Sequence, residues 1–574
     1  MNAKGFVLLG WVLMAPLIPG AAQPIFSAHD LVHPVTGLNG MVATQEAHAS
    51  RAAIEVLRAG GNAVDAAVTA GFALAVTLPR AGNLAGGGFM LVHHANPEKT
   101  IAIDYREVAP LKAHRDLFLN SSGQVDEEKS RHSHVSAGVP GTVAGLALAL
   151  ERYGTLSLSD ALQPAIRLAE EGFRVGDDLA QSLAAAKTRF ARFKAAMQVF
   201  YKPDGSNYQS GEWLRQPDLA ESLRGIAREG VDYFYQGPIA RAIASDMAAH
   251  AGIMTREDLA QYRPVVRNPV EGTYRGHRII SMPPPSSGGV HLIQMLNILE
   301  NFPLPDLGHH SAAKLHLLAE CAKPAYADRS KHLGDPDFGP VPVDQLISKD
   351  YARQLAQAID LDRATPSSAI APGLPRPEDR ESHETTHFSI IDKDGNAVAN
   401  TYTLNFSYGS KIMVPGTGIL LNNEMDDFAA KPGVPNAYGL LGGERNAIQP
   451  RKRMLSSMTP TLILGPEGTK TATGSPGGSR IITTVLQIVS NLIDHQLNAA
   501  EATHAPRMHH QWYPDTVFLE HGFSRDTIRL LEQRGHPIRH TAAMGSTQTV
   551  LLRDGRFFGA SDPRRQGAAT LAVD

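Results

Sequence analysis

The first clear alternation of apolar and polar residues lies between residues 46 and 76. Residues 46–57 repeat apolar side chains at helical spacing, which predicts an amphipathic helix. The Gly60-Gly61 pair ends this helix, and Asn62 caps a second one that runs to Val76. The second helix is apolar nearly all round, so we expect it to be buried.

Strands and helices can be predicted further along by the same criteria. A glycine-rich turn at residues 85–88 leads into an apolar strand, and residues 101–105 form another. The turn lacks the Lys-Ser/Thr of a phosphate-binding loop, so close backbone packing is its more natural use. Residues 140–260 alternate amphipathic helices with short loops, and further helices are predicted at 290–300 and 481–493.

The sharpest change of pattern in the chain is at Thr385. Residues 362–383 are rich in proline, serine and charge, which predicts an exposed, mobile loop. From Thr385 the chain is β-branched and apolar, turns at 392–395 and resumes at 397–403, which predicts a β-hairpin. Cleavage before Thr385 would give one residue both a hydroxyl nucleophile and a free α-amine base, as in N-terminal nucleophile hydrolases.

This stretch also allows two other interpretations. Threonine is common in strands, so Thr385 can simply open a hairpin. The acidic turn 392–396 has the opening spacing of an EF-hand calcium loop. However, Ala397 stands where that loop requires glycine and Thr403 where it requires glutamate, so calcium is disfavoured.

Composition narrows the class of protein. A chain of 574 residues with a net charge of −3 can form several domains or one large sandwich, and its charge implies no nucleic-acid partner. Residues 1–22 resemble a secretory signal peptide, and their apolar run is too short for a stable membrane span. The single cysteine, Cys321, excludes an internal disulfide and a cysteine-based metal site. An exported protein without disulfides fits a bacterial periplasm, or a secreted enzyme with a large core.

Several polar segments could carry chemistry. They are Arg106 after the strand 101–105, Asn405 after the hairpin, the acidic segment 422–428, the Pro/Gly-rich flap 432–450, the Ser456-Ser457 pair and the turn 473–480. An arginine at a strand end can bind a carboxylate bidentately, although a surface ion pair is the commoner role. The N–H groups of Gly477 and Gly478, at a helix start, suit an oxyanion, with an ordinary tight turn as the alternative. His504, His509 and His510 lack metal-ligand spacing, so we expect structural roles for them.

Together, these motifs resemble the γ-glutamyltransferase (γ-glutamyl transpeptidase) family. The motifs are Gly60–Ala67, Ala81–Leu84, Arg106–Pro110, Thr385–His387, Asn422–Phe428, Met454–Pro460 and Gly474–Gly478, and the resemblance runs from about residue 33 to the C-terminus. It implies an α+β fold, the four-layer αββα sandwich of N-terminal nucleophile (Ntn) hydrolases. It also implies self-cleavage between Glu384 and Thr385 into a large subunit (23–384) and a small subunit (385–574), which form a heterodimer.

The resemblance also implies roles for individual residues. For catalysis, it implies Thr385 as nucleophile, Thr403 as the residue that orients it, and Gly477 and Gly478 as oxyanion donors. For the donor, it implies that the α-carboxylate is bound by Arg106, Ser456 and Ser457. The α-ammonium is expected to be bound by Asn405, Glu424 and Asp427, and Tyr438 is expected to lie in a lid. The expected donor is glutathione or another γ-glutamyl compound, and the acceptor is an amino acid, a peptide or water. The reaction is expected to need no metal or organic cofactor.

Two residues depart from the pattern of bacterial members, and two rival functions stay open. Met454 stands where many have proline, and Glu424 where some have glutamine; a carboxylate suits an ammonium ligand as well or better. The flap indicates a member with a lid. A glutaryl-cephalosporin acylase on the same fold would share Thr385 but need no ammonium site. A protein that only binds γ-glutamyl peptides would show neither turnover nor a chain cut.

Overall fold

The computed structural model describes residues 31–370, 385–431 and 433–574. The predicted mobile loop falls largely outside these ranges, as does Glu384. The described start of that loop, residues 362–370, is exposed or half-buried as expected, with the exception of Ser367. The short 3₁₀ helix η3 (Ser367–Ala369) carries a buried Ser367, whose carbonyl accepts a hydrogen bond from Trp512 Nε1 at 3.0 Å.

Two antiparallel seven-stranded sheets form the centre of the molecule. The first sheet contains, in order, β21 (Ala569–Ala572), β2 (Gly40–Thr44), β10 (Thr386–Asp392), β11 (Ala397–Thr403), β3 (Gly87–Ala95), β4 (Glu98–Asp104) and β7 (Val265–Arg267). The second contains β1 (Val35–Gly37), β20 (Arg556–Ser561), β19 (Gln548–Arg553), β15 (Lys470–Thr473), β14 (Thr461–Leu464), β9 (His277–Ser281) and β8 (Val270–Tyr274).

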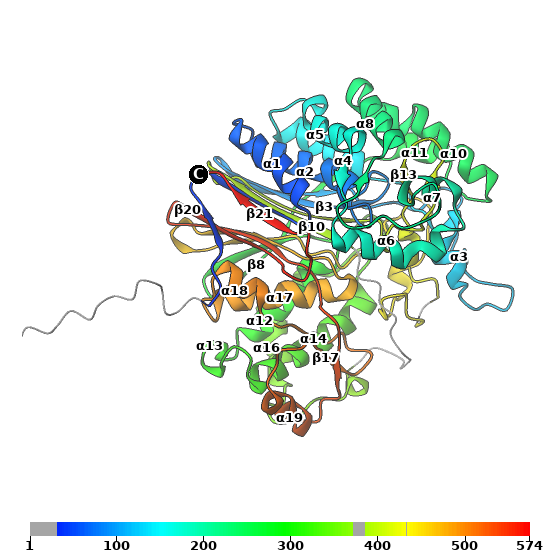
Figure 1. The fold of residues 1–574 in the computed structure, drawn as a ribbon. Coiled ribbons are helices and arrows are strands. Elements are labelled where there is room, and N and C mark those ends of the chain that lie inside the picture. Colours follow the sequence, from blue (N-terminus) through cyan, green and yellow to red (C-terminus); the bar gives the residue numbers. More distant parts are fainter. Residues whose placement is uncertain (1–30, 371–384, 432) are drawn as a thin grey trace, which may run out of the picture.

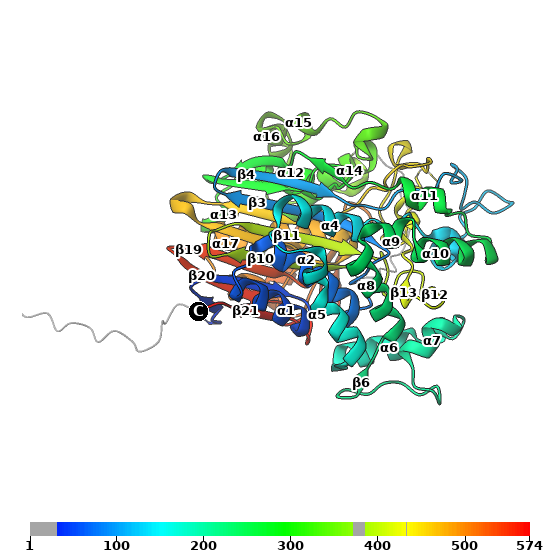
Figure 2. The same ribbon diagram turned by 90° about the horizontal axis from the view of Figure 1, so that it is seen from above.

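Helices cover the outer face of each sheet, which gives four layers in the order αββα (Figures 1 and 2). The layer over the first sheet includes α1 (Ala47–Arg58), α2 (Ala63–Thr77), α4 (Thr142–Tyr153), α5 (Leu158–Glu171) and α8 (Pro217–Glu229). The layer over the second includes α12 (Gly288–Leu299), α14 (Ala312–His332), α16 (Lys349–Gln357), α17 (Ile481–Ile493) and α18 (Ala499–His504). This arrangement confirms the predicted fold class.

Smaller elements extend the two helical layers. The additional helices are α3 (Glu127–His132), α6 (Asp177–Phe190), α7 (Lys194–Phe200), α9 (Val231–Tyr235), α10 (Pro238–Ala249), α11 (Arg256–Gln261), α13 (Leu304–Leu307), α15 (Val343–Leu346) and α19 (Arg525–Gln533). The additional strands are the pair β5 (Phe173–Arg174) and β6 (Trp213–Leu214), the pair β12 (Met413–Val414) and β13 (Ile419–Leu420), and the trio β16 (Met508–His509), β17 (Val517–Leu519) and β18 (Ile538–His540).

The predicted helix pair near the N-terminus is confirmed as α1 and α2. Asn62 caps α2 in a capping box: its side chain accepts from the backbone N–H of Asp65, and the Asp65 carboxylate accepts from the N–H of Asn62 at 2.8 Å. Every residue of α2 is buried, because the helix packs between its neighbours and the first sheet.

The predicted hairpin is confirmed as β10 and β11, in the middle of the first sheet. All residues of both strands are buried. Side chains alternate between two cores: Phe388 and Ile390 face the helical layer with α2, whereas Ile391 faces the second sheet. A strand that is buried on both faces fixes its register firmly, and the first residue before β10 is therefore held in a defined place.

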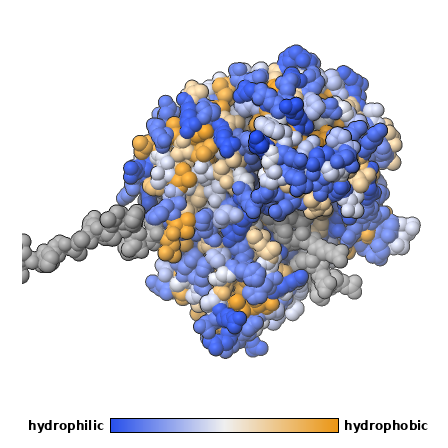
Figure 3. All heavy atoms as spheres, in the orientation of Figure 1, coloured by the Kyte–Doolittle hydropathy of each residue, from blue (hydrophilic) through white to orange (hydrophobic). Residues whose placement is uncertain are grey.

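The molecular surface in the view of Figure 3 is mainly hydrophilic, with apolar residues in small groups. Among the described residues, no helix is long and apolar enough to cross a membrane.

Candidate active site

Thr385 lies at the open end of the central hairpin, one residue before β10. Its side chain is buried, and its Oγ1 lies 3.4 Å from the Oγ1 of Thr403, the last residue of β11. The pairing of Thr386 with Tyr402 sets this approach. The hairpin register therefore places two threonine hydroxyls side by side in the interior.

The glycine-rich turn that precedes β3 packs against the backbone of Thr403. A Cβ atom on Gly86 would lie 2.0 Å from the Thr403 carbonyl oxygen, so only glycine allows the two backbones to approach. The Asn83 side chain donates to the same carbonyl at 2.9 Å, and Thr403 Oγ1 accepts from the backbone N–H of Asn405 at 2.9 Å. The glycine motif thus serves close packing, as predicted.

The acidic segment forms the 3₁₀ helix η4 (Glu424–Asp427) on one side of the threonines. Asn422 fastens it: its Oδ1 accepts from the N–H groups of Glu424 and Gly138, and its Nδ2 donates to the carbonyls of Ala85 and Gly138, all at 2.8–2.9 Å. Both carboxylates that were predicted to bind an ammonium are therefore presented by a rigid turn.

Arg106, two residues after β4, is fully buried and paired with these carboxylates. Its Nη1 donates to Glu424, and its Nη2 lies 2.5 Å from Asp427 Oδ2. Its Nε donates to the carbonyl of Met454 at 3.3 Å. Burial opposes the charged form, but the two carboxylates outweigh it and raise the pKa of Arg106 above its usual value. The two groups predicted to bind opposite ends of a donor thus bind each other.

The Ser456-Ser457 pair lies on the other side of Arg106 and is fixed by the turn that precedes α12. Ser287 donates to the Ser456 carbonyl through both its N–H, at 2.8 Å, and its hydroxyl, at 2.7 Å. Arg329 of α14 donates to Ser287 Oγ at 2.9 Å and to Ser457 Oγ at 3.2 Å. Burial lowers the pKa of Arg329 to about 10.

The turn at Gly477 and Gly478 opens the 3₁₀ helix η7 (Gly478–Arg480), which continues into α17. Their φ angles are +133° and +56°, a region that favours glycine. Tyr438 of the flap packs directly on this turn, because a Cβ on Gly478 would lie 2.6 Å from its ring. The Tyr438 hydroxyl donates to Asn405 Oδ1, and the Tyr438 carbonyl accepts from Gln511 at 3.1 Å. The described part of the flap is thus packed down onto the site.

These side chains line one pocket. Its lining is Arg106, Arg329, Thr385, Thr403, Asn405, Glu424, Asp427, Tyr438, Leu440, Ser456, Ser457, Met458, Gly478, Ser479 and Ile481. The structure therefore brings together all the residues that the sequence singled out except Gly477, which is the neighbour of a lining residue, and Glu384, which is not described. Sequence reasoning missed Arg329, because a charge within a helix normally marks a solvent-facing position.

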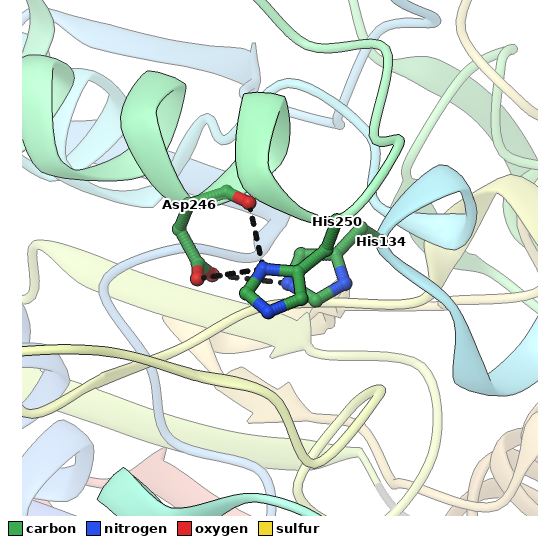
Figure 4. Close-up of side chains that lie close together, drawn as sticks. All are labelled: His134, Asp246 and His250. Atoms are coloured by element: carbon green, nitrogen blue, oxygen red, sulfur yellow. Dashed lines mark hydrogen bonds and ion pairs between the residues drawn. The ribbon is translucent and has the colours of Figure 1, made fainter.

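Two groups of histidine and acidic side chains lie outside this pocket. In the first, His134 Nε2 is 3.0 Å from one oxygen of Asp246, and His250 Nδ1 is 3.2 Å from the other (Figure 4). The two rings stack in parallel, with centroids 4.5 Å apart and planes 8° apart. Their in-plane lone pairs therefore do not converge on one point, and the group is better described as two imidazoles that share a carboxylate.

The second group is buried and hydrogen-bonded. His316 Nδ1 lies 2.7 Å from His536 Nε2, and Glu320 is paired with Lys323 at 2.7 Å. Of the histidines that were predicted to be structural, His509 bonds to Thr483 at 2.7 Å.

The gamma-glutamyltranspeptidase family model matches residues 49–572. The chain belongs to the gamma-glutamyltranspeptidase family. It is 53% identical to the glutathione hydrolase proenzyme of Escherichia coli (strain K12), over 93% of this chain and 92% of that protein. It is 45% identical to the protein of the same name from Pseudomonas sp. (strain A14), over 94% and 95% of the two chains.

A solved structure of the same architecture is the cephalosporin acylase from Bacillus halodurans. It superposes with a TM-score of 0.83 at 28% identity, over 98% of this chain and all of that one (100%). The αββα sandwich is therefore that of the Ntn hydrolases, as the resemblance implied. Membership in the family makes this protein an enzyme of that type.

Proposed function

We propose that this protein is a γ-glutamyltransferase and glutathione hydrolase that matures by cutting its own chain between Glu384 and Thr385. The main support is the composition of the pocket: it combines the Thr385 hydroxyl with one guanidinium and two carboxylates that belong to a single ion-pair cluster. A γ-glutamyl head carries the complementary pair of charges, an α-carboxylate and an α-ammonium. The relatives above, which are glutathione hydrolase proenzymes by name, point to glutathione as the donor.

Donor binding exchanges one set of ion pairs for another. The donor carboxylate binds to Arg106 and to the hydroxyls of Ser456 and Ser457. The donor ammonium binds to Glu424, Asp427 and the Asn405 side chain. Because each buried charge keeps a partner throughout, the exchange avoids the large cost of an unpaired charge in the interior. An acyl group that lacked either end would leave one side of the cluster uncompensated, which selects a free glutamyl head.

The acyl transfer then needs only groups on this chain. Thr385 Oγ1 attacks the γ-carbonyl, and its proton passes to the α-amine of the same residue, whose ordinary pKa of about 7.7–8.0 suits a base at neutral pH. The N–H groups of Gly477 and Gly478 hold the oxyanion, and Thr403 orients the attacking hydroxyl. The amide C–N bond breaks, and the ammonium returns its proton to the leaving amine of cysteinylglycine. Water or an amino acid then releases the γ-glutamyl ester.

Maturation uses the same hydroxyl. Before the cut, Thr385 has no free amine, so its Oγ1 attacks the carbonyl of Glu384 and the acyl group moves from nitrogen to oxygen. Water opens this ester and leaves residues 23–384 and 385–574 as two subunits. Removal of residues 1–22 as a signal peptide would place the mature enzyme in the periplasm.

A rival proposal is an acylase, as in the cephalosporin acylase of similar fold. It would accept a glutaryl group, which lacks the ammonium. We disfavour it because Glu424 and Asp427 would then have no ligand charge to bind.

The decisive experiment compares wild type with Thr385→Ala and Thr385→Ser. Wild type and Thr385→Ser should each give two bands on a denaturing gel, and N-terminal sequencing of the shorter wild-type band should begin at residue 385. Thr385→Ala should stay full length and inactive; two bands from this variant would overturn the proposal. Release of nitroaniline from a glutaryl rather than a γ-glutamyl anilide would establish the acylase instead.

A further inference from the structure

Arg329 is a buried cation whose role in the pocket has no explanation in the donor site described so far. It projects from α14 into the pocket and is 5% exposed. Among the described residues, no carboxylate lies within ion-pair distance of its guanidinium, in contrast to Arg106, which has Glu107, Glu424 and Asp427 within that distance. Its partners are two neutral hydroxyls, Ser287 and Ser457. A buried charge that no carboxylate contacts directly is costly, so its retention at a pocket wall points to an anionic ligand group.

The hydrogen-bond directions around Arg329 support the same conclusion. Ser457 Oγ accepts from Arg329 Nη2, so its own proton is left to donate to another acceptor. Ser287 Oγ accepts a hydrogen bond from Arg329 Nε and donates its own proton to the Ser456 carbonyl. This second bond fixes the main chain of the serine pair. Arg329 therefore sets the positions of both serines, and it leaves the Ser457 hydroxyl directed as a donor.

Charge is distributed unevenly along the pocket. Arg106 is shared by Glu424 and Asp427, so these three side chains together carry a net negative charge. Arg329, which contacts Ser457 and no carboxylate, adds positive charge to the part of the lining that holds the serine pair. A zwitterionic head with its ammonium toward η4 and its carboxylate toward Ser457 matches this polarity, whereas the reverse orientation opposes it.

We infer that Arg329 is the positioning residue that makes the enzyme specific for donors with an α-carboxylate. It acts through Ser457, whose hydroxyl it turns toward that carboxylate, and through the positive potential that it adds to this part of the pocket lining. This inference rests on the proposed function, since it names the element of the same site that recognises one end of the γ-glutamyl head.

The test uses three anilide donors that differ only at the head: γ-glutamyl-, 4-aminobutanoyl- and glutaryl-4-nitroanilide. The second lacks the α-carboxylate and the third lacks the α-ammonium. For Arg329→Gln, the preference for γ-glutamyl over 4-aminobutanoyl, measured as the ratio of kcat/KM values, should fall by about tenfold or more, because a charged hydrogen-bond partner is lost. The preference over glutaryl should change far less. A merely structural role would lower the rates on all three donors together and leave both ratios unchanged.

Controls separate the possible outcomes. Lys331→Gln removes an exposed charge from the same helix and should behave as wild type. Arg329→Lys keeps the charge but lacks the planar fork, so it should restore part of the preference. It also serves if Arg329→Gln does not fold, which the two-band pattern reports. Where an analogue reacts too slowly, inhibition constants of L-glutamate and 4-aminobutanoate replace the rates, and only the former should rise.

Failure of the inference and failure of the proposed function give different results. If wild type releases nitroaniline from the γ-glutamyl donor and Arg329→Gln or Arg329→Lys keeps the wild-type preference, the inference is wrong. If wild type does not turn over the γ-glutamyl donor, the proposed function itself is wrong.

Discussion

The guanidinium of Arg106 and the carboxylate of Glu424 form an ion pair whose two side chains are each only 1% exposed. The two residues are 318 positions apart in sequence, on opposite sides of the proposed cut. Removing one partner from such a pair leaves a buried charge, which typically costs about 3–5 kcal/mol. The pair therefore links the stability of the fold to the residues of the proposed donor site.

Arg106→Ala should lower both the free energy of unfolding, by about 3–5 kcal/mol, and the affinity for γ-glutamyl donors, while self-cleavage persists because the cut needs only Thr385. Denaturant unfolding, steady-state kinetics and a denaturing gel measure the three effects. The double variant Arg106→Ala/Glu424→Gln is the control: it removes one of the two carboxylates that lose their partner, so it should regain part of the stability without regaining donor affinity. An unchanged KM in Arg106→Ala would remove Arg106 from its proposed role.

Gly478→Ala should reduce kcat by about 100- to 1,000-fold, the usual effect of losing one oxyanion donor. The added methyl strains a backbone at φ +56° and collides with the Tyr438 ring, so the N–H group moves. Gly468→Ala is a matched control, since its φ is +77° and no atom lies within 4 Å of the added methyl. The control should lose about 1 kcal/mol of stability and no activity. Equal kcat values in the two variants would exclude an oxyanion role for this turn.

Tyr438→Phe removes the hydroxyl that bonds to Asn405 but keeps the ring that packs on Gly478. We expect faster hydrogen exchange in residues 433–442, because a net hydrogen bond of about 1 kcal/mol that holds the flap is lost. Tyr408→Phe, which loses a bond to Ser182 away from the pocket, is the control and should leave this segment as in wild type. Unchanged exchange in Tyr438→Phe would mean that the ring, and not the hydroxyl, holds the flap.

Glu107 adjoins Arg106, is fully buried, and has no hydrogen-bond partner for either carboxylate oxygen among the described residues. Burial raises its pKa from 4.5 to about 8, which the nearby Arg106 only partly offsets. Between these two values, the unfolded chain has released a proton that the folded protein retains. The free energy of unfolding therefore falls as pH rises through this window.

Glu107→Gln cannot titrate, so it should lose this pH dependence. The difference in melting temperature, variant minus wild type, should be more positive at about pH 9 than at about pH 5. Thermal unfolding across this range measures the difference. A constant offset at all pH values would show that Glu107 is ionised in the folded state.

The sequence predicted those helices and strands whose local residue preferences agree with their place in the fold. Capping and periodicity fixed α1 and α2 because a capped helix needs only its own residues and one buried face. The hairpin was equally clear, since β10 and β11 are adjacent in sequence and in the sheet. The candidate site could be assembled only through the family resemblance, because its parts come from segments hundreds of residues apart.

Other features depend on three-dimensional contacts that no local pattern encodes. Arg329 reads as a solvent-facing charge until α14 is seen to be buried on nearly all sides. The mutual pairing of Arg106 with Glu424 and Asp427 could not be predicted, because the resemblance describes ligand contacts and not the empty pocket. Composition predicts an exposed segment around Ser367, which the structure confirms, but it does not predict the hydrogen bond from Trp512 to this one buried residue.

The order of strands within the sheets has a further consequence. In the first sheet, β10 and β11 lie between β2 and β3, and in the second, β1 and β9 flank strands from beyond residue 385. A cut before Thr385 would thus yield two chains that both contribute strands to each of the two sheets. Their separation would require both sheets to be disrupted. After denaturation, refolding of the cut protein would require two separate chains to associate, whereas the precursor folds as a single chain. The proposed cut would therefore make the native fold harder to regain once it is lost.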